Sequence, residues 1–160
     1  MINAQNKGKQ AERDVANYLT RCGLADANGG PVRRYVRTGT AGEHDEGDLK
    51  IPGVTIEVKH WAGDLTHGSI VTLLAKLARQ CGPGYELGIL VDRLDSIGGH
   101  RAGEWKCHLW LSTFRDLIGG FDAQLPAGDA PITMQLQTFV GLWIASGRAF
   151  VVNPFARATQ

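Results

Sequence analysis

The stretch from residue 48 to residue 59 constrains the fold more than any other part of the sequence. Val54–Lys59 is rich in β-branched residues, and Asp48–Ile51 alternates polar and apolar side chains. Pro52-Gly53 lies between these two segments and is a typical tight-turn pair. We therefore predict an antiparallel hairpin here, as part of a larger sheet.

The register of this hairpin brings charged side chains together. If the turn is symmetric, Leu49 lies opposite Ile56, and Asp48 lies opposite Glu57. Side chains alternate between the two faces of a strand, so Glu57 and Lys59 share one face. An asymmetric or bulged turn would change this pairing and remains the alternative.

Two facing carboxylates repel one another unless a positive charge lies between them. Lys59 is one candidate for that charge, and a divalent cation is the other. Oxygen ligands without a nearby set of His or Cys residues favour Mg²⁺ or Mn²⁺. Such an ion lowers the pKa of bound water and neutralises charge that develops on a phosphodiester. The pattern alone leaves open a surface ion pair on an ordinary hairpin.

The remaining elements are predicted from hydrophobic periodicity and turn residues. Helices are expected at about 6–22, 69–81 and 112–118, with a second strand-to-helix step near 136–143. Further strands are expected at 32–36, 85–91 and 106–111, with an edge strand at 150–152. Ser69 and Ser112 are expected to cap their helices, and 96–103 is expected to be a mobile glycine-rich loop. This order predicts an α/β fold, a mixed β-sheet flanked by α-helices.

The composition fits one cytoplasmic domain. The chain has 160 residues and 43% apolar content, which suits a single domain with a core at about 6–118 and an apolar C-terminal extension at 119–160. No apolar run approaches the length of a membrane span, and the N-terminus lacks the apolar stretch of a signal peptide. The three cysteines are odd in number and far apart, which suits a reducing cytoplasm and argues against a disulfide framework.

Charge is unevenly distributed along the chain, although the net charge is only +1. Residues 1–37 carry seven Lys and Arg side chains against three acidic ones, whereas residues 38–67 carry two against six. This order is suited to a phosphate-gripping surface beside a cation-binding pocket. An ordinary solvated surface is equally compatible with the charges alone.

The order of these motifs resembles that of the PD-(D/E)XK nuclease superfamily. Asp48 precedes one apolar strand and Glu57-Val58-Lys59 ends the next, which is similar to the motif that defines the superfamily. Residues 7–14 resemble the first helix of its archaeal-type Holliday junction resolvases, and Arg37–Gly42 resembles their Arg/Ser/Gly loop. The resemblance covers about residues 7–60 and implies a restriction-endonuclease-like fold.

The resemblance also implies a role for each residue of the motif. Asp48 and Glu57 would be the ligands of Mg²⁺, for which Mn²⁺ could substitute. Lys59 would be the catalytic lysine. Glu12 would be the helix carboxylate that completes the catalytic site.

The loop before Asp48 departs from the pattern of the family. Thr38 and Thr40 stand where the family usually has serines; they keep the hydroxyl, Thr40 as a catalytic residue and Thr38 as a DNA contact. The loop is longer and more acidic than in the family, so Asp45 or Glu46 could contribute to the metal site.

Basic and polar side chains near the motif are the candidates for DNA contacts, and we expect two or three of them to contact phosphates. They are Lys7, Lys9, Arg13, Arg34, Arg37, Thr38 and His60.

The resemblance implies a homodimer that binds branched DNA and cleaves Holliday junctions or related branches. The apolar residues Phe139, Leu142, Trp143 and Ile144 are expected to supply the dimer interface. Two alternatives stay open: a restriction- or repair-type nuclease of the same superfamily, and a catalytically inactive DNA-binding module.

Overall fold

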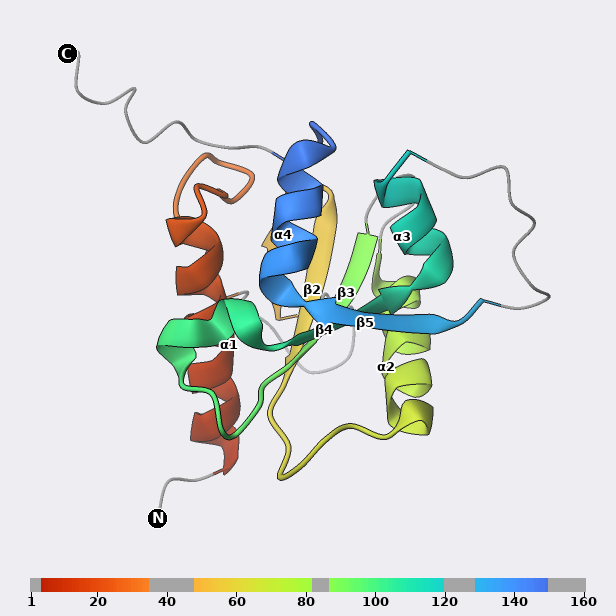
Figure 1. The fold of residues 1–160 in the computed structure, drawn as a ribbon. Helices are drawn as coiled ribbons and strands as arrows, with labels where there is room; N and C mark the ends of the chain where they lie inside the picture. The colour runs from red at the N-terminus through yellow and green to blue at the C-terminus, as the bar shows by residue number, and fades with distance from the viewer. Residues whose placement is uncertain (1–3, 35–47, 82–86, 120–128, 150–160) are drawn as a thin grey trace.

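The structure is a computed structural model that describes residues 4–34, 48–81, 87–119 and 129–149 (Figure 1). Its elements, in chain order, are α1 (Ala4–Arg21), β1 (Leu49–Ile51), β2 (Val54–Lys59), α2 (His67–Gln80), β3 (Leu87–Asp92), a 3₁₀ helix (Gly99–Glu104), β4 (Lys106–Trp110), α3 (Leu111–Leu117), β5 (Pro131–Gln135) and α4 (Leu136–Ala145).

The five strands form one mixed sheet in the order β1-β2-β3-β4-β5. Only β2 and β3 run parallel, joined through α2, while the other neighbouring strands are antiparallel. Within the first hairpin Leu49 pairs with Ile56 and Ile51 with Val54, as predicted from the symmetric turn. The predicted class, a mixed sheet flanked by helices, is therefore confirmed.

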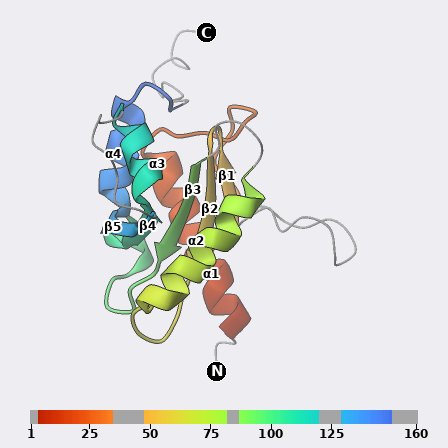
Figure 2. The same ribbon diagram turned by 90° about the vertical axis from the view of Figure 1, so that its right-hand side faces the viewer.

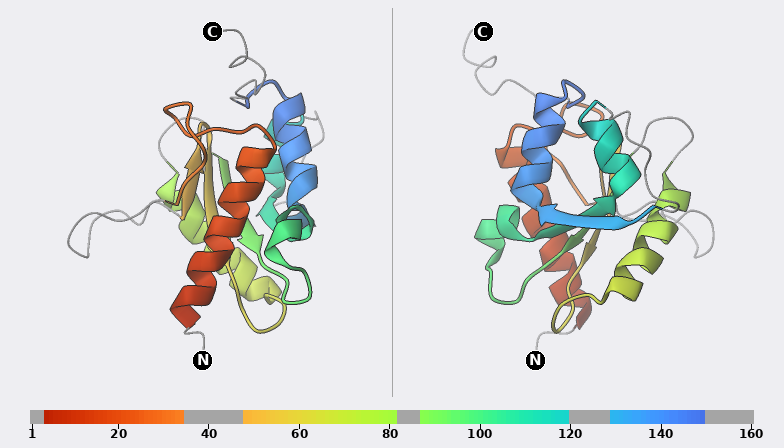
Figure 3. Two further views of the ribbon diagram at one scale, coloured as in Figure 1. Left: turned by 90° about the vertical axis from the view of Figure 1, so that its left-hand side faces the viewer. Right: turned by 45° about the vertical axis from the view of Figure 1, so that its right-hand side comes forward.

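Helices cover both faces of the sheet. Figure 2 shows α2 in front of β2 and β3, and α1 lies on the opposite side, as the left view of Figure 3 shows. The face towards α1 and α4 carries the larger apolar cluster, which includes Ile56, Ile89 and Leu109. The face towards α2 has a smaller cluster around Leu74 and Leu90. Because that second face is only partly apolar, it has room for polar side chains.

The segment predicted to be a mobile loop at 96–103 instead ends in the 3₁₀ helix, which packs on α1. A Cβ atom added at Gly103 would lie 2.7 Å from the ring of Tyr18, and one added at Gly99 would lie 2.1 Å from Asp14 Oδ2. Trp105 follows this helix, is fully buried and donates its indole N–H to the carbonyl of Ile97 at 3.1 Å. These glycines allow close packing, so residues 99–103 form a helix where a loop was expected.

The helix starts also differ from the prediction. Thr66, rather than Ser69, caps α2, and its Oγ1 accepts the N–H of Ser69 at 3.2 Å. Helix α3 begins at Leu111, directly after β4, so Ser112 lies within the helix and donates its N–H to Asp129 at 3.0 Å. A strand that continues straight into a helix leaves no separate position for a capping residue.

The C-terminal segment belongs to the core rather than extending from it. Strand β5 pairs with β4, and α4 buries Leu136, Phe139 and Trp143 in the larger cluster. The rings of Phe139 and Trp143 are stacked with centroids 6.5 Å apart. These two residues, expected at an interface between copies of the chain, therefore pack inside a single copy.

Three predicted strands fall wholly or partly outside the described residues. Residues 150–152 lie outside them, of 85–91 only the last five residues are described, and of 32–36 only the first three. Within that part, Arg34 forms an isolated antiparallel bridge with Leu49. None of the helices in the described ranges has the length and apolar character needed to cross a membrane.

Candidate functional site

Charged residues at the ends of several strands lie close together at one edge of the sheet. Because β2 and β3 are parallel, their last residues, Lys59 and Asp92, are register partners. Strand β4 is antiparallel to β3 and starts at the same edge, where Lys106 pairs with Asp92. Asp48 stands at the start of β1, also at this edge. Residues far apart in the sequence therefore meet at one end of the sheet.

The regular pairing of the hairpin stops just before Asp48. Its N–H donates to the carbonyl of Ile56 at 3.0 Å, the residue already paired with Leu49. Its carboxylate Oδ2 accepts the backbone N–H of Val58 at 2.8 Å. A side chain therefore replaces a main-chain partner where β1 leaves β2. The strict pairing of Asp48 with Glu57 does not occur, but the carboxylate lies against the end of β2.

Glu57 and Lys59 lie on one face of β2, as the alternation predicts. Glu57 is 5% exposed, and its Oε1 forms an ion pair and hydrogen bond with Lys59 Nζ. A buried carboxylate needs such a partner, because an uncompensated charge in the protein interior is costly. Lys59 is thus the partner of Glu57 in the structure, and its charge also acts on Asp48.

Glu12 reaches this edge from α1. Its carboxylate pairs with Arg34, whose backbone bridges to Leu49 at the outer side of β1. The charge of Glu12 also acts on Asp48. The structure therefore brings together Glu12, Asp48 and the β2 pair, the four residues that the sequence assigned to one site.

The electrostatics of the site centre on Asp48. Burial, followed by the negative charge of Glu57 and a smaller effect of Glu12, raises the pKa of Asp48 from 3.8 to about 6. The Val58 N–H and the Lys59 ammonium lower this pKa without cancelling the rise. The site holds three carboxylates, Asp48, Glu57 and Glu12, against two basic side chains, Lys59 and Arg34.

The donor chemistry of the site fits a hard divalent cation, since it offers carboxylate oxygens. In the described part of the chain, however, no three His, Cys, Asp or Glu side chains are arranged as a ready-made metal site. Glu12 and Glu57 are instead held by Arg34 and Lys59. A cation shared by these carboxylates would therefore require the ion pairs to open.

The predicted DNA contacts have different surroundings. Lys7, Lys9 and Arg13 are exposed along α1. Arg34 is engaged with Glu12, and His60 Nε2 lies 2.6 Å from Asp95 Oδ1. The last two side chains therefore already have partners within the chain.

Part of the predicted site lies outside the described residues. This part contains Arg37, Thr38 and Thr40, together with Asp45 and Glu46, the two alternative metal ligands.

Two notable residues at this edge were not assigned to the site from the sequence. Asp92 is buried beside Lys59 and Lys106, and Trp61 is 55% exposed two residues beyond Lys59. Asp92 could have been found, because an acid that ends an apolar strand lies beside the end of any parallel neighbour. The exposure of Trp61 had no comparable signal in the sequence.

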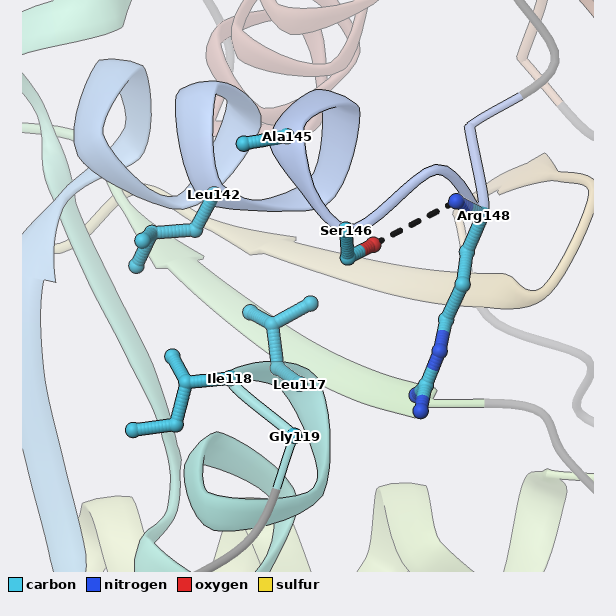
Figure 4. Close-up of a pocket in the computed structure, with 7 residues that line it drawn as sticks. All are labelled: Leu117, Ile118, Gly119, Leu142, Ala145, Ser146 and Arg148. Carbon is cyan, nitrogen blue, oxygen red and sulfur yellow. Dashed lines mark hydrogen bonds between the residues drawn. The ribbon is translucent and has the colours of Figure 1, made fainter.

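A separate apolar pocket of about 370 Å³ lies between the end of α3 and α4 (Figure 4). Its lining includes Leu117, Ile118, Leu142 and Ala145, with Arg148 at one side. None of the charged residues at the sheet edge lines it, so we do not assign the proposed chemistry to this pocket.

Neither protein-family models, nor curated proteins, nor solved structures show a match to this chain.

Proposed function

We propose that the protein is a metal-dependent endonuclease that hydrolyses DNA phosphodiester bonds at the sheet edge formed by Asp48, Glu57 and Lys59. The supporting observation is the position of Asp48. Its carboxylate lies against the end of β2, and burial together with Glu57 raises its pKa to about 6. Groups with strongly perturbed pKa values cluster at functional sites, and carboxylates are suited to hold the metal ions that assist phosphodiester hydrolysis.

The proposed fold is the restriction-endonuclease-like form of the α/β class, as in PD-(D/E)XK nucleases. A helix with a site glutamate, an antiparallel hairpin with the acidic residues, a crossover helix and a parallel strand support this assignment. The resemblance of residues 7–60 to archaeal-type Holliday junction resolvases supports branched DNA as the substrate.

The residues would divide the work as follows. Asp48 and Glu57 hold Mg²⁺, with Mn²⁺ as a substitute, and Glu12 completes the carboxylate set. When bound, the ion lowers the pKa of a water molecule and neutralises charge on the phosphate. Lys59 orients the attacking water or stabilises the charged phosphate. The exposed side chains of Lys7, Lys9 and Arg13 contact DNA phosphates, which makes binding sensitive to salt.

The proposal extends to the assembly and the compartment. A homodimer would present two such sites to two symmetry-related strands of a four-way junction. Because Phe139 and Trp143 are buried within one copy, the remaining candidates for the dimer surface are Leu142 and Ile144. A cytoplasmic location suits the free cysteines.

Labelled four-way junction, linear duplex and flap DNA, each incubated with Mg²⁺ or with EDTA, test the proposal. Symmetric, Mg²⁺-dependent cuts in the junction would support the resolvase. Metal-dependent cleavage of linear duplex alone would favour a restriction or repair nuclease. Binding without cleavage of any substrate would contradict the nuclease and leave a DNA-binding module. Asp116→Asn, an exposed carboxylate on α3, serves as the matched control and should cut as the wild type does.

A further inference from the structure

Asp92 is a buried carboxylate whose charge has no obvious structural use. It ends β3, is 1% exposed, and neither of its oxygens makes a hydrogen bond within the described residues. Burial raises the pKa of the Asp92 carboxyl group, and the nearby Leu65 N–H and Lys106 charge lower it without cancelling that rise. Leaving a buried polar group unpaired destabilises a protein, so each such group calls for an explanation.

Two cations flank Asp92, and each is held by another acid. Lys59 and Lys106 are its register partners on β2 and β4, so all three side chains emerge on the same face of the sheet. In the structure Lys59 pairs with Glu57, and Lys106 Nζ lies 2.8 Å from Asp64 Oδ1. Asp92 therefore neighbours two lysines across the strands and pairs with neither; Lys106 and His60 are the basic residues whose charges act on Asp92 in the structure.

We infer that Asp92 is a positioning residue that receives the ammonium group of Lys59 when Glu57 is engaged by another ligand. This inference rests on the proposed function and deepens it, because a divalent cation at Glu57 competes with Lys59 for the same carboxylate and weakens their ion pair. Asp92 then supplies a second anion on the same face, and the contact gives Asp92 the partner it lacks. Lys59 stays ordered at the edge of the site, where the proposed chemistry needs it.

Lys59 is the better candidate for this exchange than Lys106. The ion pair of Lys59 is made with a residue of the proposed site, so binding there breaks it. The Asp64 partner of Lys106 is 70% exposed and belongs to the connection between β2 and α2, outside the proposed carboxylate set. Nothing that binds at Glu57 would release Lys106.

Double-mutant cycles on the metal-free, DNA-free protein test the exchange directly. Asp92→Asn and Lys59→Met are combined in two backgrounds, wild type and Glu57→Gln, and stability is measured by urea unfolding. In the wild type, where Lys59 pairs with Glu57, the two changes should be additive to within about twofold in the unfolding constant. In Glu57→Gln, where Lys59 is released, their coupling should reach about tenfold.

Two further cycles act as controls. Asp116→Asn combined with Lys59→Met should be additive in both backgrounds, because Asp116 pairs with Arg115 on another element. Asp92→Asn combined with Lys106→Met should give the same coupling in both backgrounds. A Lys59 coupling that stays below about twofold in Glu57→Gln would overturn the inference. A coupling between Asp92 and Lys106 that instead increases in Glu57→Gln would overturn the inference as well.

Kinetics separate this inference from the proposed function. In the active protein, Asp92→Asn should lower kcat about tenfold and leave KM within about twofold, because it disorders Lys59 without removing a DNA contact. A wild type that never cleaves contradicts the proposed function but leaves the unfolding cycles intact. A wild type that cleaves, with an unchanged kcat in Asp92→Asn, contradicts the inference alone.

Discussion

At the scale of single residues, the site is a balance of buried charges. Asp48, Glu57 and Glu12 carry the negative charge, while Lys59 and Arg34 partly neutralise it. Residue types and strand alternation were sufficient to predict Asp48, Glu57 and Lys59 as one site, whereas Glu12 was added only by the resemblance to a known family. The role of Arg34 was not predictable, because its contact with Glu12 depends on how α1 lies against β1.

The raised pKa of Asp48 predicts a pH dependence of stability. A carboxyl group whose pKa is higher in the folded than in the unfolded state stabilises the fold while it is protonated. For Asp48 that contribution is complete below its unfolded pKa of 3.8 and is lost as pH rises through about 6. Asp48→Asn keeps an acceptor for the Val58 N–H and removes the charge. Above about pH 7 this variant should be more stable than the wild type by about 2 kcal/mol, after allowing for partial solvent screening.

Urea unfolding in EDTA across this pH range measures the difference. The two proteins should converge below about pH 3, where the wild-type carboxyl group is protonated in both states. Asp116→Asn should show no such pH-dependent gain. An Asp48→Asn protein that is no more stable than the wild type at alkaline pH would contradict the electrostatic description of the site.

At the scale of secondary-structure elements, the hairpin and the 3₁₀ helix show what the sequence could and could not reveal. The register of β1 and β2 was predictable, because a two-residue turn and alternating side chains fix it. The 3₁₀ helix was not, because glycine has the same sequence signature in a mobile loop and in a close contact. Only the packed structure shows that Gly103 faces the ring of Tyr18.

Gly103→Ala tests this packing. A Cβ atom there would lie 2.7 Å from Tyr18, so the 3₁₀ helix or α1 must shift. We expect a loss of about 1–3 kcal/mol in the free energy of unfolding, the usual effect of overpacking. Gly68→Ala in α2 is the matched control, since nothing lies within 4 Å of a Cβ atom there. That change should be neutral or stabilise the protein by up to about 1 kcal/mol. Equal stability of the two variants would show that the 3₁₀ helix is loosely held.

At the scale of the whole molecule, the C-terminal strand and helix complete the fold. The apolar residues of α4 were recognisable from the sequence, but the surface against which they pack was not. An apolar helix face packs equally well against its own sheet or against a second copy of the chain. The pairing of β5 with β4 decides this, and strand pairing across 20 or more residues is not readable from local pattern.

Trp143→Ala tests whether α4 is part of the core. Trp143 is 3% exposed and stacks on Phe139, so its truncation should cost about 3–5 kcal/mol at every protein concentration. Ile144→Ala, at the next position and 38% exposed, should cost less than about 1 kcal/mol. Thermal unfolding at several concentrations measures both. A Trp143→Ala effect that disappears on dilution would place this residue at an interface between copies.

Single-turnover cleavage of a four-way junction by matched single-site variants tests the proposed site most directly. DNA affinity is measured in parallel in EDTA, for the wild type, Asp48→Asn, Glu57→Gln, Lys59→Met and the control Asp116→Asn. We expect the three site variants to cut at least about 100-fold more slowly in Mg²⁺ while binding the junction with unchanged affinity. The control should match the wild type. Cleavage at the wild-type rate by any of the three site variants would show that the edge formed by Asp48, Glu57 and Lys59 is not the active site.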